Sequence, residues 1–383
     1  MSSIAVNAIT DADGGNTASI NGATPTTDNT MGRNRVINGA MEIAQRGTAA
    51  VTTGGTFPVD RWQVVQTTSG KCSVQQNANA ITPPVGFTNY LGVVSLSAYS
   101  LTASDYYQVR QKLEGFNVAD FDWGTANARP ITVSFWVYSS LTGNFGLVVS
   151  WGSSSSNERT YPILYSITSA NTWEYKTITI SGDTTMPAGG FETGNGSGIQ
   201  LRFSLGGGAT NAGTSGAWAT ANYQTVTGDT SVVSTNGATF YITGVQLETG
   251  SVATSFERRQ YGQELALCQR YYYRRNYDQT TVDVVAVFSA YSSGGAWGKI
   301  IDFPVEMRAT PTASLSSIGH FRPTNTSGSS LSAFTAGNLA GQGTSKTQLT
   351  TAGWSGSSGM TAGNAVAILN NTTSAWIDAS AEL

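Results

Sequence analysis

Regular alternation of apolar and polar residues is the dominant pattern in the first two thirds of the chain. Residues 131–138 read ITVSFWVY, residues 145–151 read FGLVVSW and residues 199–205 read IQLRFSL, and every second residue of each is apolar. A period of two residues is typical of a β-strand with one face in a core. Further candidate strands lie at residues 59–66, 91–97, 106–113, 173–180 and 239–247, and turn-rich segments separate them.

These strands predict an all-β protein. Because each strand has one apolar face, we expect two antiparallel sheets that pack face to face. About eight strands of this length match a jelly roll, so residues 34–252 predict a jelly-roll-like antiparallel β-sandwich. Residues 276–383 predict a smaller C-terminal β-sandwich domain, in which the Gly-, Ser- and Thr-rich residues 324–363 form long loops. Its candidate strands are residues 282–290, 297–305, 312–318, 365–370 and 375–379.

One segment between these two β-rich regions has a helical period instead. Its apolar stripe has the spacing i, i+4, i+7 and i+11 and consists of Tyr261, Leu265, Cys268 and Tyr272. This spacing predicts a short linker helix over residues 253–275. A tyrosine-rich helix that joins two modules suits an oligomer interface. The candidate interface residues are Tyr261, Leu265, Tyr271 and Tyr272.

The first 33 residues are polar and show no sustained periodicity. A segment of this kind cannot bury enough apolar surface to fold alone, so residues 1–33 predict an N-terminal arm that is ordered only against something else.

Composition and charge exclude several classes of function. Charged residues make up only 11% of the chain, and its formal net charge is −3. No basic run exceeds two residues, so nucleic-acid binding has little electrostatic support. We expect no signal peptide and no membrane insertion, because the chain lacks a charged and apolar leader and any apolar run near ~18 residues. Cys72 and Cys268 are too few for a disulfide framework and are predicted to be small buried hydrophobes.

The sequence offers few candidate catalytic residues. The only histidine is His320, and we interpret it as a surface or turn residue rather than part of a triad. The acids are scattered, and the pair Asp120 and Asp122 could equally bind Ca²⁺ or cap a turn. The sequence therefore predicts no catalytic residue, no metal site and no cofactor, and the chain is predicted not to be an enzyme.

Aromatic residues are the better binding candidates. Sugars stack their C–H faces on Trp and Tyr rings, and rings in loops are more available than rings on strand faces. Four rings lie in or beside Gly-rich loops and form a candidate glycan-binding set: Trp218, Tyr223, Trp354 and Trp151.

Three segments resemble those of tailed-bacteriophage virion fibre proteins. The first runs from NRVINGAMEIAQRGT to DRW at residues 34–62, the second covers residues 245–273, and the third is IDFPVEMRATPT at residues 301–312. Residues 1–33 also look like an N-terminal particle-attachment sequence. The resemblance implies a virion structural protein with a carbohydrate-binding-module-like sandwich, which is assembled in the cytoplasm of the host bacterium.

Three functions follow from the resemblance and the residues. The first is a tail fibre, commonly a homotrimer, which binds other tail or head proteins through residues 1–33 and contacts host surface polysaccharide. The second is a head decoration or tail-collar subunit without receptor binding. The third is a capsular polysaccharide depolymerase, which would need two carboxylates about 5–10 Å apart in a groove with flanking rings.

Overall fold

The computed structural model describes residues 32–152, 158–187, 190–277, 283–325, 327–339, 344–350 and 353–383. The chain divides into two compact units, Met1–Arg259 and Gln260–Leu383. The predicted arm lies outside the described residues, except for its last two residues. The predicted all-β class is confirmed, because antiparallel sheets dominate both units and the described residues contain a single α-helix.

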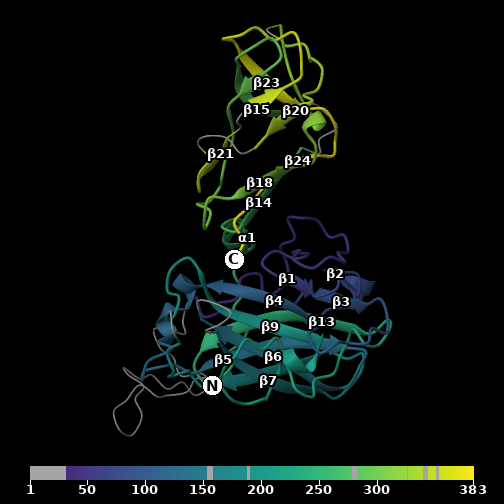
Figure 1. The fold of residues 1–383 in the computed structure, drawn as a ribbon, viewed down its shortest axis with the longest axis vertical. Helices are drawn as coiled ribbons and strands as arrows, with labels where there is room; N and C mark the ends of the chain where they lie inside the picture. Colours follow the sequence, from purple (N-terminus) through teal and green to yellow (C-terminus); the bar gives the residue numbers. More distant parts are fainter. Residues whose placement is uncertain are drawn as a thin grey trace, which may run out of the picture. The chain divides into compact units, whose positions relative to one another are not determined.

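Two antiparallel sheets make up most of the first unit (Figure 1). The six-stranded sheet has the order β1 (Gln63–Gln66), β4 (Tyr106–Glu114), β9 (Ser197–Gly207), β6 (Gly143–Trp151), β7 (Arg159–Ile167) and β11 (Ala219–Thr220). The five-stranded sheet has the order β2 (Cys72–Gln76), β3 (Leu91–Ser95), β13 (Thr239–Thr249), β5 (Ile131–Ser139) and β8 (Glu174–Ile180). A short parallel pair, β10 (Ala212–Gly213) and β12 (Thr225–Val226), lies outside both sheets. Short 3-10 turns cover Ala78–Ala80, Gly115–Asn117, Ala119–Phe121 and Ala209–Asn211.

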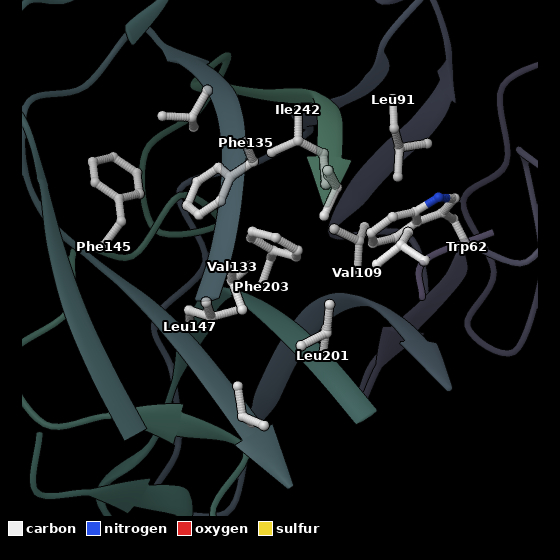
Figure 2. Close-up of a cluster of buried hydrophobic side chains, with 14 of the residues drawn as sticks. Trp62, Leu91, Val109, Val133, Phe135, Phe145, Leu147, Leu201, Phe203 and Ile242 are labelled. Carbon is white, nitrogen blue, oxygen red and sulfur yellow. The ribbon is translucent and has the colours of Figure 1, made fainter. Parts of the chain in front are cut away.

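The core of the first unit lies between the two sheets (Figure 2). The Phe135 ring from β5 meets the Phe203 ring from β9 edge to face, with centroids 5.0 Å apart, and Trp62 contacts Phe203 from the other side. Each large apolar side chain that leaves water here stabilises the fold by roughly 1.5–3 kcal/mol. The apolar positions of the alternating pattern are the ones that face the other sheet, as the sequence predicted.

Strand β6 differs from the simple alternating pattern because it is buried on both faces over most of its length. Its outer side lies against β12, where a Cβ on Gly146 would be 3.0 Å from Val226. The outer residue Val148 is accordingly fully buried. Part of the outer face of the six-stranded sheet is thus covered, and the part over β4 and β9 is left open.

The segment NRVINGAMEI closes one edge of the sandwich between β4 and β13. The Ile37 amide donates to Gln111 Oε1 at 2.9 Å, and Gln111 Nε2 donates to the Ile37 carbonyl at 2.8 Å. On the other side the Val245 amide donates to the Gly39 carbonyl at 3.0 Å, and the Asn34 side chain spans Val245 and Leu247. This first segment of the virion-protein resemblance is therefore a scaffold element.

The second unit contains three smaller sheets around a core of its own. One has the order β14 (Tyr272–Tyr277), β24 (Ala375–Ser380) and β18 (Thr312–Leu315). Another has the order β19 (Phe321–Pro323), β23 (Ala365–Asn370), β15 (Val284–Ala290), β16 (Ala296–Trp297), β22 (Gly353–Ser355) and β20 (Ala336–Asn338). A two-stranded sheet pairs β17 (Lys299–Asp302) with β21 (Gln348–Thr350), and Ile318–His320 forms a 3-10 turn.

The α-helix is shorter than the predicted residues 253–275. Helix α1 covers Tyr261–Gln269, and Tyr272 belongs to β14 instead of the helix. The chain before it cannot be helical because its amides are bonded elsewhere: Thr254 N donates to Glu248 Oε1, and Glu257 N donates to Gln246 Oε1, both at 2.8 Å. After it, β14 pairs with β24 along its whole length. No helix among the described residues is long and apolar enough to cross a membrane.

Candidate functional site

Two of the four predicted glycan-binding rings are buried, which corrects the prediction for them. Trp151 is 1% exposed and donates its indole N–H to Asp183 Oδ2 at 3.0 Å. Trp354 is fully buried in the second unit, where Phe288, Phe321 and Phe334 surround its ring. Both rings close a core next to a loop, so a sugar cannot reach either of them.

The other two rings lie at or near the surface of the first unit. Trp218 is half-buried, packs edge to face on Trp123 at 5.1 Å, and donates to the Ser181 carbonyl at 2.9 Å. Tyr223 is also half-buried, and its carbonyl accepts from Arg202 at 2.7 Å. Both remain predictions as ligand contacts, and Trp218 has an evident packing role.

The predicted oligomer-interface residues differ in exposure. Tyr261 is 62% exposed and Leu265 is half-buried, so both are accessible on α1. Tyr271 and Tyr272 are buried within the second unit, and the Tyr272 hydroxyl donates to Asp378 Oδ2 at 2.7 Å. The prediction is wrong for these two tyrosines, because the helix ends before them and the chain turns inward into β14.

A groove of about 460 Å³ lies on the open part of the six-stranded sheet's outer face. Successive side chains of β4 and β9 point to opposite faces of the sheet. The residues between their core-facing positions therefore point out of the sandwich. Strand pairing sets Arg110 directly opposite Arg202 across the floor. The lining residues come from both strands and from the segments that follow β6, precede β7 and β9, and precede β12: Tyr106, Arg110, Lys112, Gly152, Glu158, Glu192, Gly196, Ser197, Gln200, Arg202, Asn222 and Gln224.

A buried ion pair forms the base of this groove. Arg202 is 2% exposed, and its Nη2 donates to Glu158 Oε1 in a very short contact. Its Nη1 donates to Asn222 Oδ1 at 3.1 Å as well as to the Tyr223 carbonyl. Removing either partner of this pair would leave an uncompensated buried charge. Arg202 also joins three chain segments, because it lies on β9 and bonds to Glu158 before β7 and to Asn222 and Tyr223 before β12.

Amide side chains extend this network along the groove. Gln108 Nε2 donates to Gln224 Oε1 at 2.9 Å, and Gln224 Nε2 in turn donates to Asn222. Gln200 Oε1 accepts from Arg202 at 3.3 Å. Amide groups both donate and accept hydrogen bonds, as sugar hydroxyls do. The lining can therefore exchange hydrogen bonds with a hydroxylated ligand.

Two further cations line the groove, and neither forms an ion pair with a carboxylate among the described residues. Arg110 Nε donates to the neutral Gln63 Oε1 at 2.9 Å. The Lys112 ammonium makes no hydrogen bond or ion pair with any described residue. Burial, helped by the nearby Arg110 and Arg202, lowers the pKa of Lys112 to about 8, and burial also lowers the pKa of Arg110. A cation whose pKa burial lowers although one carboxylate, Glu158, lies nearby marks a functional-site candidate.

Several buried polar atoms at this face also lack a partner in the described part of the chain. Arg202 Nε and Ser197 Oγ belong to lining residues, Gln108 Oε1 lies on β4, and Ser150 Oγ lies on the neighbouring strand β6. Buried polar groups are normally hydrogen-bonded, so these four atoms mark a polar environment beside the groove.

The two carboxylates of the groove have different surroundings. Glu158 is held by Arg202, whereas Glu192 Oε1 accepts the Gly194 amide at 2.7 Å. No group of three or more His, Cys, Asp or Glu side chains among the described residues could hold a metal ion. His320 lies in a 3-10 turn, and its Nδ1 is 2.8 Å from Ser316 Oγ. Cys72 and Cys268 are both free and buried.

The comparisons with known proteins give only distant likenesses. No family model and no curated protein matches the sequence. Among solved structures, the enzymatically active domain of tailspike protein 4 of bacteriophage CBA120 is 14% identical with a TM-score of 0.31, covering 57% of this chain and 21% of that one. The family 11 carbohydrate-binding module of a Clostridium thermocellum cellulase is 13% identical with a TM-score of 0.25, covering 54% and 98%. A family 61 module in complex with β-1,4-galactotriose is 15% identical with a TM-score of 0.26, covering 57% and 99%. At these TM-scores the likenesses carry no weight for what this chain binds.

Proposed function

We propose that this chain is a non-enzymatic structural protein of a bacteriophage virion, a tail fibre whose larger unit binds host surface glycan in the groove on β4 and β9. The virion role is supported by the three sequence segments that resemble fibre proteins. In this proposal residues 1–33 attach the chain to other virion proteins, and several copies, as a homotrimer, act on one cell surface. Linked copies raise weak individual contacts by factors of about 10²–10⁴ when their geometry permits it.

The groove itself is the observation that carries the glycan-binding part of the proposal. Its lining combines three amide side chains, Gln200, Asn222 and Gln224, with the half-buried Tyr106 and the two cations Arg110 and Lys112. A purely structural head or collar subunit has no need of such a lining. If the groove binds no glycan, the structural alternative is favoured.

Binding is tested on an array of bacterial surface polysaccharides with the full-length protein. We expect Gln200→Ala to weaken binding about tenfold, since a hydrogen bond to a polar ligand is worth about 1 kcal/mol and an unpaired Arg202 contact adds to the loss. The matched control is Gln75→Ala, because Gln75 lies on β2 in the other sheet. Equal losses in both variants, or no binding by the unmodified protein, would contradict the proposal.

Glycan cleavage is the second candidate function, and the presence of Glu158 and Glu192 in one groove favours it. Hydrolysis by two acids needs one carboxyl that can donate a proton and one that is free to act as base or nucleophile. Glu158 Oε1 already accepts a hydrogen bond from Arg202, so this oxygen is not free to contact a substrate. We expect no release of reducing sugar from polysaccharides that bind. Release that Glu192→Gln abolishes would make the chain a depolymerase.

A further inference from the structure

We infer that the groove selects an acidic glycan and that Arg110 and Lys112 bind a sugar carboxylate there. This inference rests on the proposed glycan-binding function and adds the chemical class of the ligand. The charged residues that line the groove are the evidence for an acidic ligand.

The lining has one positive charge in excess. Three cations face two carboxylates, and Glu158 neutralises Arg202 at the base. Glu192 is bonded to a backbone amide rather than to a cation. The excess charge therefore belongs to Arg110 and Lys112, which lie on the same outward face of β4 two residues apart. A single carboxylate would neutralise it, whereas a phosphate monoester would bring nearly twice the required charge.

The surroundings of Lys112 explain why an anion should bind. Its charged neighbours are Arg110 on the same strand, Arg202 on β9, Arg61 beside β1, and the carboxylate of Glu158. Burial lowers the pKa of Lys112 to about 8, and the three positive neighbours among these four add to that effect. An anionic ligand removes this repulsion when it binds, and the guanidinium of Arg110 offers a planar fork that matches a carboxylate.

The remaining lining suits the neutral part of a sugar. Tyr106 is half-buried and lines the groove, and a tyrosine ring can stack on the C–H face of a sugar. Gln200 and Asn222 line the groove with amide groups that can exchange hydrogen bonds with ligand hydroxyls. A volume of about 460 Å³ is in the range of small-ligand sites. The occupant is therefore a short stretch of saccharide with one carboxylate in the groove.

The test compares uronic-acid-containing bacterial polysaccharides with the same polysaccharides after reduction of their carboxyl groups. The full-length protein is immobilised, and affinities are measured at pH 7 and low salt. We expect at least tenfold weaker binding after carboxyl reduction. Lys112→Met and Arg110→Met should each weaken binding of the acidic forms about tenfold and have a smaller effect on the reduced forms.

Controls separate loss of charge from loss of fold. Lys112→Arg keeps the charge and should retain binding within about threefold, and Lys176→Met removes a lysine on β8 in the other sheet that is paired with Glu174. Equal binding of the acidic and reduced forms would overturn the acidic preference while the glycan-binding function stands. Tighter binding of phosphate-bearing polysaccharides would overturn the choice of carboxylate. Absence of binding to every polysaccharide would overturn both proposals.

Discussion

One residue of the groove lining, Lys112, lowers the stability of the fold because its charge is partly buried. Lys112 is partly buried and has three cations and one carboxylate, Glu158, as charged neighbours. Apolar side chains such as Val109 and Leu113 alternate with it and are fully buried on the other side of the same strand. A residue whose removal should stabilise the fold is typical of a functional site, because selection for binding opposes selection for stability.

We predict that Lys112→Met stabilises the protein at pH 7. The pKa of Lys112 is about 8 in the fold against 10.5 in the unfolded chain, so its penalty is fully present below pH 8. Between pH 8 and 10.5 the folded state releases its proton while the unfolded state keeps it, so the free energy of unfolding rises with pH. After allowance for solvent screening, the gain should be about 1–2 kcal/mol at pH 7 and should shrink towards pH 10. Urea denaturation at pH 7, 8.5 and 10 measures it, and a gain that is equal at all three values would contradict the role of charge.

The same titration should control binding of an acidic glycan. Lys112 is protonated below about pH 8 and neutral above it, so affinity for the acidic form should fall by about tenfold between pH 7 and 9.5. Bound anion favours the charged lysine and shifts the fall to slightly higher pH. In Lys112→Arg the affinity should stay constant across this range, because guanidinium remains charged. Parallel loss of affinity in the arginine variant would show that another group titrates.

At the level of elements, most strands could be predicted from the sequence, but which strands pair with each other could not. The alternation at residues 131–138 and 199–205 predicted β5 and β9, and the inward residues were correctly identified. The pairing of β4 with β9 joins Arg110 to Arg202 across a long stretch of chain, and one strand's pattern contains no information about its partner. The groove was missed for this reason, although the polar positions YYQVRQKLE and IQLRFSL were visible.

For helix α1, the local pattern predicted the helix but placed its ends wrongly. An apolar stripe at helical spacing extended to Tyr272, but the helix ends at Gln269 and the tyrosines enter a strand. Backbone pairing of β14 with β24 outweighed the local period. The rings of Trp151 and Trp354 were misjudged similarly, because a nearby Gly-rich loop does not show whether a ring points outward or into a core.

Gly39 lies in the segment NRVINGAMEI, which closes one edge of the sandwich, and its surroundings give a specific prediction. A Cβ on Gly39 would lie 2.1 Å from the Val245 carbonyl oxygen, and backbone cannot move away cheaply. We expect Gly39→Ala to lower the free energy of unfolding by about 2–3 kcal/mol. Gly262→Ala is the control, since nothing lies within 4 Å of its added Cβ in α1, and it should raise stability by about 0.5–1 kcal/mol. Thermal denaturation of both variants measures this, and a neutral Gly39→Ala would contradict the close packing.

At the scale of the whole molecule, each of the two compact units has a main hydrophobic core of its own. One is centred on Phe135 and Phe203 in the first unit, and the other on Trp354 in the second. The sequence predicted two β-rich parts because turn-rich and helical residues divide them, but it gave no means to place the boundary at Arg259 and Gln260. The role of residues 1–33 stays a prediction.

Two cores predict two unfolding transitions. A domain with its own core can unfold cooperatively by itself. We expect differential scanning calorimetry of the full chain to show two transitions, and Gly39→Ala to lower only the transition of the first unit. Phe288→Ala, which removes a ring packed on Trp354, should lower only the other. A single transition that both substitutions shift equally would indicate one cooperative molecule.

The central claim is that the outer face over β4 and β9 binds a glycan. A crystal structure of the chain soaked with an acidic oligosaccharide released from a polysaccharide that it binds tests this most directly. The account predicts sugar density against Tyr106 with a carboxylate within hydrogen-bonding distance of Arg110 and Lys112. Sugar bound instead at Trp218, or on the outer face of the five-stranded sheet, with this groove empty, would contradict it.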